Sequence, residues 1–336
     1  MGLKSKLGTL PKGKKNSLCD VPGVRVGHKT LNKGKSQTGV TAIIPAEGSL
    51  FKNKVEAGVS ILNGFGKSVG LMQVEELGTL ETPIVMTNTL SVGIALSALT
   101  KYMLWQNEEI GETTGTVNCL VTECNDSRIN DIRGLHVKEE DVLFALNNTD
   151  ENVEEGAVGA GRGMVCFGLK GGIGSSSRIL SFEGHEYSVG ALVLSNFGGP
   201  GQLRLDGNKI ISNSSTGSKG DMGSIIMILA TDLPLSSRQL KRLANRCAIS
   251  LGRTGSIMGH GSGDIALAFS TAQRIAHSPE GIFEKKTYLY EEHIEKVFVA
   301  GIEAVEEAIY SSLYHAETMV DRKGKIVHSL KEYWNE

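Results

Sequence analysis

Ser224-Ile-Ile-Met-Ile-Leu-Ala230 is an almost unbroken apolar run. A second run, Ile265-Ala-Leu-Ala-Phe269, follows the small polar segment Gly259-His-Gly-Ser-Gly-Asp264. Neither run has the polar alternation of a half-exposed strand, so each predicts a strand buried on both faces. Two hydroxyl groups, those of Ser224 and Ser262, therefore lie where buried strands emerge from glycine-rich loops. We expect the chemistry of the protein at these two strand ends.

Other apolar segments predict the remaining elements. Strands are expected at 39–44, 58–62, 83–87, 117–123, 163–167 and 188–194. Helical spacing of apolar residues predicts helices at 91–107, 236–251 and 289–315, the second with Ser236 or Ser237 as its N-cap. Strands and helices follow one another irregularly and without a repeat. This order favours layered α/β packing in one large domain over a barrel or a doubly wound sheet.

Composition argues against several classes of partner. The 336-residue chain has a net charge of −2, from 35 Lys and Arg against 37 Asp and Glu, and only 5% aromatic residues. We therefore expect no nucleic acid partner and no attachment to a membrane surface. Residues 1–18 are rich in lysine but lack the apolar core of a secretory signal, and no stretch approaches the ~18 apolar residues of a membrane span. These features predict a cytoplasmic protein with a flexible basic leader (1–18) and a single domain (19–336).

The sequence gives no indication of a metal or a cofactor. The five cysteines have no metal-ligand spacing, which predicts buried free thiols: Cys19, Cys119, Cys124, Cys166 and Cys247. The glycine-rich segments 63–70, 159–163 and 170–178 lack the spacing of a dinucleotide fingerprint or a P-loop. Taken singly, each is more typical of tight turns.

A nucleophilic Ser224 needs a base, and no histidine context favours a Ser-His-Asp triad. A base appears if the Gly223–Ser224 bond is cut, because the new α-amino group lies beside its own hydroxyl. Its reference pKa of ~7.7–8 is far below the ~10.4 of lysine, so part of it is neutral at pH 7. The polar, turn-forming segment 206–223 ends at this bond and is the best candidate for an exposed, cleavable loop.

Several further motifs occur in a fixed order along the chain. They are Asp20-Val-Pro-Gly-Val-Arg-Val-Gly-His28, Thr38-Gly-Val-Thr-Ala-Ile-Ile44, Asn63-Gly-Phe-Gly66, Thr87-Asn-Thr-Leu-Ser-Val-Gly93, Glu123-Cys-Asn-Asp126 and Lys170-Gly-Gly-Ile-Gly-Ser-Ser-Ser-Arg178. With the segments 223–232 and 261–270, they make the chain resemble, from about Leu18 to Leu330, the self-processing N-terminal serine aminopeptidases. This is the L-aminopeptidase/D-esterase and β-peptidyl aminopeptidase family.

The resemblance implies a four-layer αββα sandwich, related to ornithine acetyltransferase and similar in plan to N-terminal nucleophile hydrolases. It also implies self-cleavage between Gly223 and Ser224, leaving chains 19–223 and 224–336 in one folded unit. Small peptides, amides or esters would be the substrates, no cofactor would be needed, and the protein would be a homo-oligomer, with a tetramer expected.

The same resemblance implies roles for individual residues. Ser224 is the expected nucleophile, Ser262 and Asp264 relay protons and orient it, and Asn196 stabilises the oxyanion. Substrate binding is expected at Asn63, Asn88, Glu123 and Asn125, with Glu123 or Asp264 receiving the free amino group. Where the family acid can be glutamate, this chain has the shorter Asp264.

Two alternatives remain open at this point. One is an acyltransferase like ornithine acetyltransferase, although its nucleophile is threonine rather than serine. The other is an uncleaved protein that binds a nucleotide or phosphate through its glycine-rich loops.

Overall fold

Two mixed β-sheets face each other across a buried apolar layer in the computed structural model, which describes residues 7–210 and 223–333. The first sheet has the order β6-β5-β2-β1-β7, formed by Leu120–Cys124, Ile84–Asn88, Ser36–Ile44, Arg25–Lys33 and Thr149–Asp150. The second has the order β10-β11-β14-β15-β3-β4, formed by Gly172–Phe182, His185–Asn196, Ser224–Thr231, Gly263–Ala276, Asn53–Gly64 and Thr79–Leu80. We call them sheet A and sheet B.

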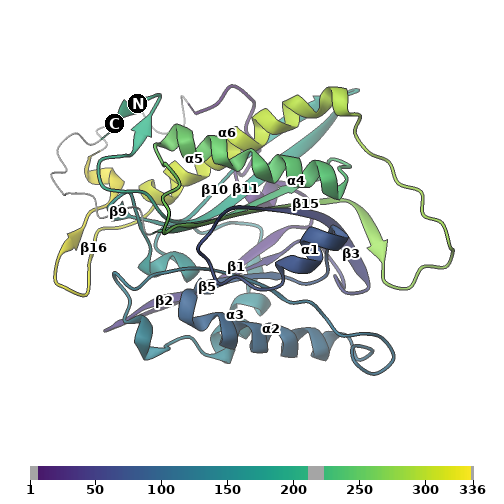
Figure 1. The fold of residues 1–336 in the computed structure, drawn as a ribbon, viewed down its shortest axis with the longest axis horizontal. Coiled ribbons are helices and arrows are strands. Elements are labelled where there is room, and N and C mark those ends of the chain that lie inside the picture. Colours follow the sequence, from purple (N-terminus) through teal and green to yellow (C-terminus); the bar gives the residue numbers. More distant parts are fainter. Residues whose placement is uncertain (1–6, 211–222, 334–336) are drawn as a thin grey trace.

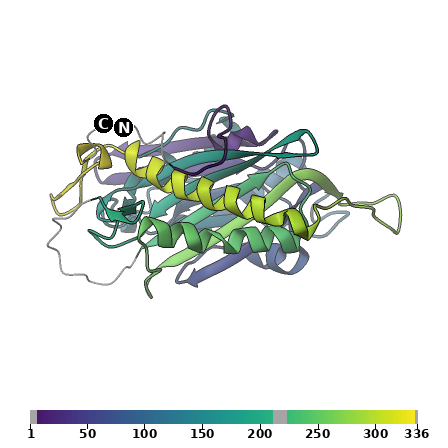
Figure 2. The same ribbon diagram turned by 90° about the horizontal axis from the view of Figure 1, so that it is seen from above.

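Helices cover the outer face of each sheet (Figure 1). Against sheet A, Val85 and Val121 share an apolar cluster with α2 (Val92–Gln106) and α3 (Glu139–Asn147). Against sheet B, Met227 and Leu229 share a cluster with α4 (Ser237–Asn245), α5 (Cys247–Thr254) and α6 (Ile294–Tyr314). Figure 2 shows α6 running along the sheet beside α4 and α5. The outer helices and the inner apolar layer together bury both faces of the central strands.

The two strands that decide the fold are confirmed. All eight residues of β14 are buried, as are the first eight of β15. The two strands pair in parallel, and β14 also pairs antiparallel with β11. The side chains of β14 alternate between the two apolar layers, with Ile225 facing the helices and Ile226 facing sheet A. A strand with apolar neighbours on both faces explains the unbroken apolar run.

The predicted helix at 236–251 is two helices rather than one. Ser236 caps α4, as expected, and forms a capping box with Gln239. The helix ends at Arg246, which serves as C-cap of α4 and N-cap of α5. The predicted helices at 91–107 and 289–315 appear as α2 and α6, the latter preceded by a short 3₁₀ turn at Glu291–His293.

The tight turns expected at 170–178 are wrong for most of that segment, because β10 begins at Gly172. Its serines donate hydrogen bonds to backbone carbonyls, from Ser175 to Ala191 (2.7 Å) and from Ser176 to Ala304 (2.6 Å), so they can be buried. Gly174 lets α6 approach, since a Cβ there would overlap the carbonyl oxygen of Ala308. Small polar residues thus form a buried strand here.

The expectation of a loose leader is wrong for residues 7–18, which pack on sheet B and α6. Leu7 is buried, and its carbonyl accepts a hydrogen bond from Arg178 (2.9 Å). The backbone N–H of Thr9 donates to Glu303 (2.7 Å), and Lys12 pairs with Glu307 (2.7 Å). The segment is therefore held by acidic side chains of α6, Glu303 and Glu307, that the local sequence does not reveal.

The remaining elements are short. They are α1 (Leu71–Leu77), 3₁₀ turns at Leu18–Asp20, Thr89–Ser91, Ile132–Gly134, Gly159–Gly163 and Leu330–Glu332, and strands β8 (Val165–Cys166), β9 (Leu169–Lys170), β12 (Arg204–Leu205), β13 (Asn208–Lys209), β16 (Met319–Val320) and β17 (Ile326–Val327). All five cysteines are buried and free, as predicted. Most of the expected cleavable loop, 211–222, lies outside the described residues. Of the helices in the described part of the chain, none combines the length and the apolar character needed to span a membrane.

Candidate active site

Four strands of sheet B bring the expected catalytic residues to one edge of the sheet. Asn196 at the end of β11 lies opposite Ser224 at the start of β14. Ser224 is in turn the register partner of Gly263, at the start of β15. On the other side of β15, Asp264 lies opposite Asn63 of β3. Residues far apart in the sequence thus meet because their strands begin or end together.

Ser224 is buried and lies beside the carbonyl group that the proposed cut would release. Its Oγ donates a hydrogen bond to the carbonyl oxygen of Gly223 (2.7 Å). The backbone N–H of Gly263 donates to the same carbonyl oxygen, with its nitrogen at 3.2 Å, and the nitrogen lies 3.4 Å from the Oγ of Ser224. A Cβ at position 223 would overlap the carbonyl oxygen of Asn196, so the close approach of the strands requires glycine there.

Ser262 and Asp264 form a buried pair that flanks Gly263, the register partner of Ser224. The Oγ of Ser262 donates to Oδ1 of Asp264 at 2.6 Å, and both residues are almost fully buried. The shorter acidic side chain therefore still reaches its serine. A hydroxyl that donates to a carboxylate keeps its own lone pairs available. The Oγ of Ser262 can therefore accept a hydrogen bond from a neighbouring donor while Asp264 fixes the orientation of the Ser262 hydroxyl.

The amide group of Asn196 is held by two backbone contacts. Its Oδ1 accepts from the N–H of Val165 (3.0 Å), and its Nδ2 donates to the carbonyl oxygen of Asn125 (3.0 Å). These contacts fix which end of the amide is the donor. Residues directly opposite in an antiparallel pair point to the same face, so Asn196 and Ser224 share a face of sheet B. An amide nitrogen carries two hydrogens, which leaves one N–H of Asn196 for a substrate oxygen.

Two of the predicted substrate-binding residues instead hold the local backbone. Nδ2 of Asn63 donates to the carbonyl oxygens of Met258 (3.3 Å) and Gly259 (2.7 Å), which fixes the loop that leads to Ser262. Asn88 is buried and caps the 3₁₀ turn after β5, since its Oδ1 accepts from the N–H groups of Leu90 and Ser91. Their polar atoms have local partners on the protein itself.

Glu123 is the last but one residue of β6 in sheet A and is buried. Its Oε1 accepts from the N–H of Lys67 (2.8 Å), and its Oε2 accepts from the hydroxyl of Thr89. A Cβ on Gly66 would lie 3.6 Å from Oε1 of Glu123, and Gly66 in turn packs against Gly263. Each carboxylate oxygen has a second lone pair, so this buried acid can still accept from a substrate amine. Asn125, two residues later, contributes its backbone carbonyl to Asn196.

Comparisons with known proteins identify the family. The model of peptidase family S58 matches residues 16–327. The β-peptidyl aminopeptidase BapA of Sphingosinicella microcystinivorans is 35% identical over 95% of this chain and 86% of its own length.

The chain belongs to peptidase family S58.

Two solved structures are similar to this S58 peptidase over nearly its whole length. The PH0078 protein of Pyrococcus horikoshii is 52% identical, with a TM-score of 0.93 over 98% of this chain and 94% of its own. The L-aminopeptidase D-Ala-esterase/amidase of Ochrobactrum anthropi is 35% identical, with a TM-score of 0.88 over 96% and 92%. The latter is described as a prototype for the serine aminopeptidases and as a variant of the Ntn hydrolase fold.

Together, family and relatives make this S58 peptidase a hydrolase of the aminopeptidase/amidase class with an N-terminal serine nucleophile. The acyltransferase and the nucleotide-binding alternatives are not favoured. In the described ranges, no group of three or more His, Cys, Asp or Glu side chains is arranged to hold a metal ion.

Sequence reasoning missed two residues that support the site of this S58 peptidase, and the first is the fully buried Lys170. Its Nζ donates to the carbonyl oxygens of Gly161 (3.0 Å), Met164 (2.9 Å) and Gly171 (2.7 Å). Burial lowers the pKa of Lys170 well below its ordinary value. The clamp fixes the turn that precedes Val165, whose N–H orients Asn196. The signal in the sequence was a lone lysine at the head of a Gly-Ser segment.

A buried acid next to Asn125 is the second such residue. Burial raises the pKa of Asp126 to about 6, although hydrogen bonds from Thr38 and Asn130 oppose the rise. The Nδ2 of Asn130 donates to Oδ1 of Asp126 (3.1 Å), and the backbone N–H of Asn130 donates to the carbonyl oxygen of Asp126 (2.9 Å). These bonds tie down the loop whose first residue, Asn125, contacts Asn196.

Proposed function

We propose that this protein cuts its own chain between Gly223 and Ser224 and then uses the new terminus to hydrolyse small peptides, amides or esters. The observation that carries the proposal is the Ser224 hydroxyl, buried at a strand end and 2.7 Å from the Gly223 carbonyl oxygen. In the cut, Oγ attacks the carbonyl carbon of Gly223, the C–N bond to Ser224 breaks, and water hydrolyses the resulting ester. The products are one chain ending at Gly223 and a second that begins at Ser224.

In the second reaction the free α-amino group of Ser224 takes the proton of its own hydroxyl as Oγ attacks the substrate carbonyl. The bond to the leaving amine breaks, that amine takes up the proton, and an acyl-enzyme forms on Ser224. Water then releases the acyl group as an acid. The pair of Ser262 and Asp264 relays protons beside the nucleophile, and the remaining N–H of Asn196 stabilises the oxyanion, a contribution of about 3–4 kcal/mol in comparable sites.

The chemistry of the substrate follows from its relatives and from the buried acid. Relatives named as a β-peptidyl aminopeptidase and as an L-aminopeptidase D-Ala-esterase/amidase support amide, peptide and ester substrates with a free amino end. Glu123 is buried beside Gly66, which packs against Gly263 at the catalytic edge, and we assign it to the substrate ammonium group. Asn63, Asn88 and Asn125 then shape the binding surface by holding loops.

The order of helices, sheet, sheet and helices supports a four-layer αββα sandwich related to ornithine acetyltransferase (Figure 1). The proposal further includes a homo-oligomer, a tetramer by analogy with the family, and a cytoplasmic location. Both are open to direct measurement by light scattering and by fractionation.

The test is mass spectrometry of the purified wild-type protein and of a Ser224→Ala variant. We expect two wild-type fragments, the second beginning at Ser224, and one full-length chain for the variant. Hydrolysis of an amino-acid amide should fall by up to about a million-fold in Ser224→Ala, as when a serine nucleophile is removed elsewhere. A variant that is still cut at position 223, or an active wild type that remains uncut, would refute the proposal.

A further inference from the structure

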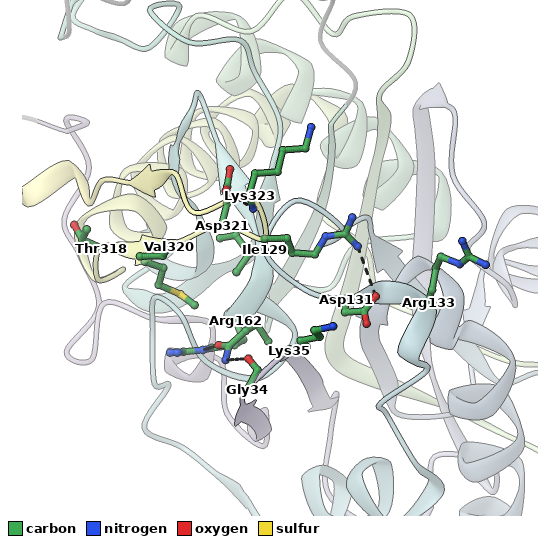
Figure 3. A pocket seen from close by; sticks show the side chains of 13 residues that line it. Gly34, Lys35, Ile129, Asp131, Arg133, Arg162, Thr318, Val320, Asp321 and Lys323 are labelled. Carbon is green, nitrogen blue, oxygen red and sulfur yellow. Dashed lines mark hydrogen bonds and ion pairs between the residues drawn. The ribbon is translucent and has the colours of Figure 1, made fainter.

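A basic cavity lies outside the residues discussed so far. It has a volume of about 780 Å³ and lies between the turn after β1, the loop 129–133 and the β16–β17 hairpin (Figure 3). Its lining includes five basic side chains and two acidic ones: Lys35, Arg133, Arg162, Arg322 and Lys323, with Asp131 and Asp321. In a chain whose net charge is −2, this is a local excess of positive charge.

The two acidic side chains are already engaged. Asp131 lies 3.7 Å from the guanidinium of Arg322. Asp321 accepts from the backbone N–H groups of Lys323 (2.8 Å) and Lys325 (3.0 Å), and lies 3.8 Å from Arg128. Burial alone would raise the pKa of Asp321, but these N–H groups and the charge of Arg128 outweigh it, so the pKa is lowered and the carboxylate stays ionised.

Several of the cations, by contrast, lack an acidic partner. Among the described residues, no carboxylate oxygen lies within 4.0 Å of the charged groups of Lys35, Arg133, Arg162 or Lys323. Arg162 is the most informative because it is half-buried and its Nε is held by Oε1 of Gln37 (2.8 Å). Burial lowers the pKa of this guanidinium, and the more distant charge of Glu317 offsets that only in part. A half-buried, oriented guanidinium favours a planar anion such as a carboxylate.

A second cavity adjoins this basic region. Its volume is about 430 Å³, and its lining shares Asp321, Arg322 and Lys323 with the first while adding Ser127, Arg128 and Lys325. Ser127 donates its backbone N–H to the side chain of Asn125 (3.0 Å), and the backbone carbonyl of Asn125 accepts from Asn196 (3.0 Å). Two residues of extended chain span at most about 7 Å. Ser127 in the cavity wall is therefore two residues along the chain from the residue that contacts the proposed oxyanion donor.

We propose that these two cavities form a groove that binds the carboxylate of the leaving part of the substrate. The inference rests on the proposed function, in which an aminopeptidase releases the carboxyl-terminal part of a short peptide as the leaving amine. That part carries a free α-carboxylate, and the groove begins close to the group assigned to the scissile carbonyl. The preferred substrates are thus short peptides with a free or acidic carboxyl-terminal end, rather than neutral amides of the same length.

The test compares a tripeptide that ends in a free carboxylate with the same tripeptide as its C-terminal amide. For the wild type we expect a higher kcat/KM for the free acid, and we expect added salt to reduce this preference because it screens the groove. Arg162→Gln and Lys323→Gln should each lower kcat/KM for the free acid by about five- to tenfold through KM, and leave the amide almost unchanged. Equal effects on both peptides, or no effect on either, would overturn the proposal.

A matched control removes one charge elsewhere. Lys285 is exposed in the loop between β15 and α6. Figure 1 shows this loop at the opposite end of the molecule from β16, so Lys285→Gln should change the hydrolysis of neither peptide. Calorimetry with the Ser224→Ala protein separates this inference from the proposed function, because binding needs no catalysis. Binding of the free acid but not of the amide, weakened by Arg162→Gln, supports the groove even if hydrolysis is absent. Equal binding of the two peptides contradicts it.

Discussion

Polar side chains lie at the strand ends of both sheet A and sheet B, but they make different contacts in the two sheets. At the edge of sheet B, Asn196 ends β11, Ser224 begins β14 and Ser262 immediately precedes β15, where the backbone N–H of Gly263 contacts the Oγ of Ser224. At the edge of sheet A, Asn88 caps a turn and Glu123 joins Lys67 to Thr89. Under the proposed function, polar side chains at the edge of sheet B take part in the reaction, and Asn88 in sheet A holds the backbone.

The difference lies in what surrounds each side chain. The amide of Asn196 is oriented by two contacts, keeps one N–H and lies opposite Ser224. The side-chain oxygen of Asn88 accepts from two backbone N–H groups, and its nitrogen donates to the hydroxyl of Thr38 (2.9 Å). Under the proposed function, an oriented amide serves the reaction only when its remaining N–H lies beside the nucleophile.

The sharpest test of the comparison exchanges one asparagine in each sheet. Asn196→Ala should lower kcat by about 10²–10³, because an oxyanion donor is lost. Asn88→Ala should leave kcat close to the wild-type value and lower the free energy of unfolding by about 1 kcal/mol, because a cap is lost. Steady-state kinetics and thermal unfolding measure the two effects.

Asn196→Asp controls for a purely structural role of Asn196. The carboxylate keeps the acceptor for Val165 but cannot donate to an oxyanion, so its kcat should be as low as that of Asn196→Ala. An active Asn196→Asp, or an Asn88→Ala that loses as much kcat as Asn196→Ala, would end the distinction between the sheets.

A smaller effect is expected from Glu123→Gln, which asks whether sheet A touches the substrate at all. If the carboxylate receives the substrate ammonium, KM should rise about tenfold for an amino-acid ester. The corresponding ester without an amino group should be hydrolysed equally well by both proteins. A drop in thermal stability with unchanged KM for both esters would instead limit Glu123 to holding Lys67 and Thr89.

The smallest expected effect is on the pH dependence of the free energy of unfolding, and it comes from His28 on β1 of sheet A. Burial lowers the pKa of His28 from 6.5 to about 4, against a weaker opposing hydrogen bond to the backbone of Glu154. The unfolded chain takes up this proton below about pH 6.5 and the folded chain does not. The free energy of unfolding is therefore unaffected by His28 above pH 6.5. It decreases as the pH falls toward 4, by up to about 3 kcal/mol in total.

Chemical unfolding of the uncut Ser224→Ala protein at pH 4 to 7, with and without His28→Gln, measures this term. Glutamine does not titrate, so the double variant should lose less stability than the Ser224→Ala parent over that range. Parallel curves for the two proteins would mean that His28 contributes nothing to acid sensitivity.

The sequence predicted the most apolar strands correctly and failed for more polar segments. The strands β14 and β15 were found because burial on both faces leaves an unbroken apolar run. The strand β10 was taken for turns, since its glycines and serines carry no such signal, and their hydrogen bonds go to backbone atoms such as the carbonyl of Ala304. The leader was misjudged for a similar reason, because Glu303 and Glu307 lie almost 300 residues away.

The sequence alone indicated two candidate serines, Ser224 and Ser262, each after a glycine and at the start of a buried strand, and the family resemblance made Ser224 the expected nucleophile. It also determined that a cut there creates a base beside the hydroxyl, since that follows from covalent chemistry alone. Only the tertiary structure decided what surrounds Ser224. The Lys170 clamp behind Asn196 and the basic groove beyond Asn125 join segments distant in sequence, and such contacts depend on strand pairing and packing that local patterns do not encode.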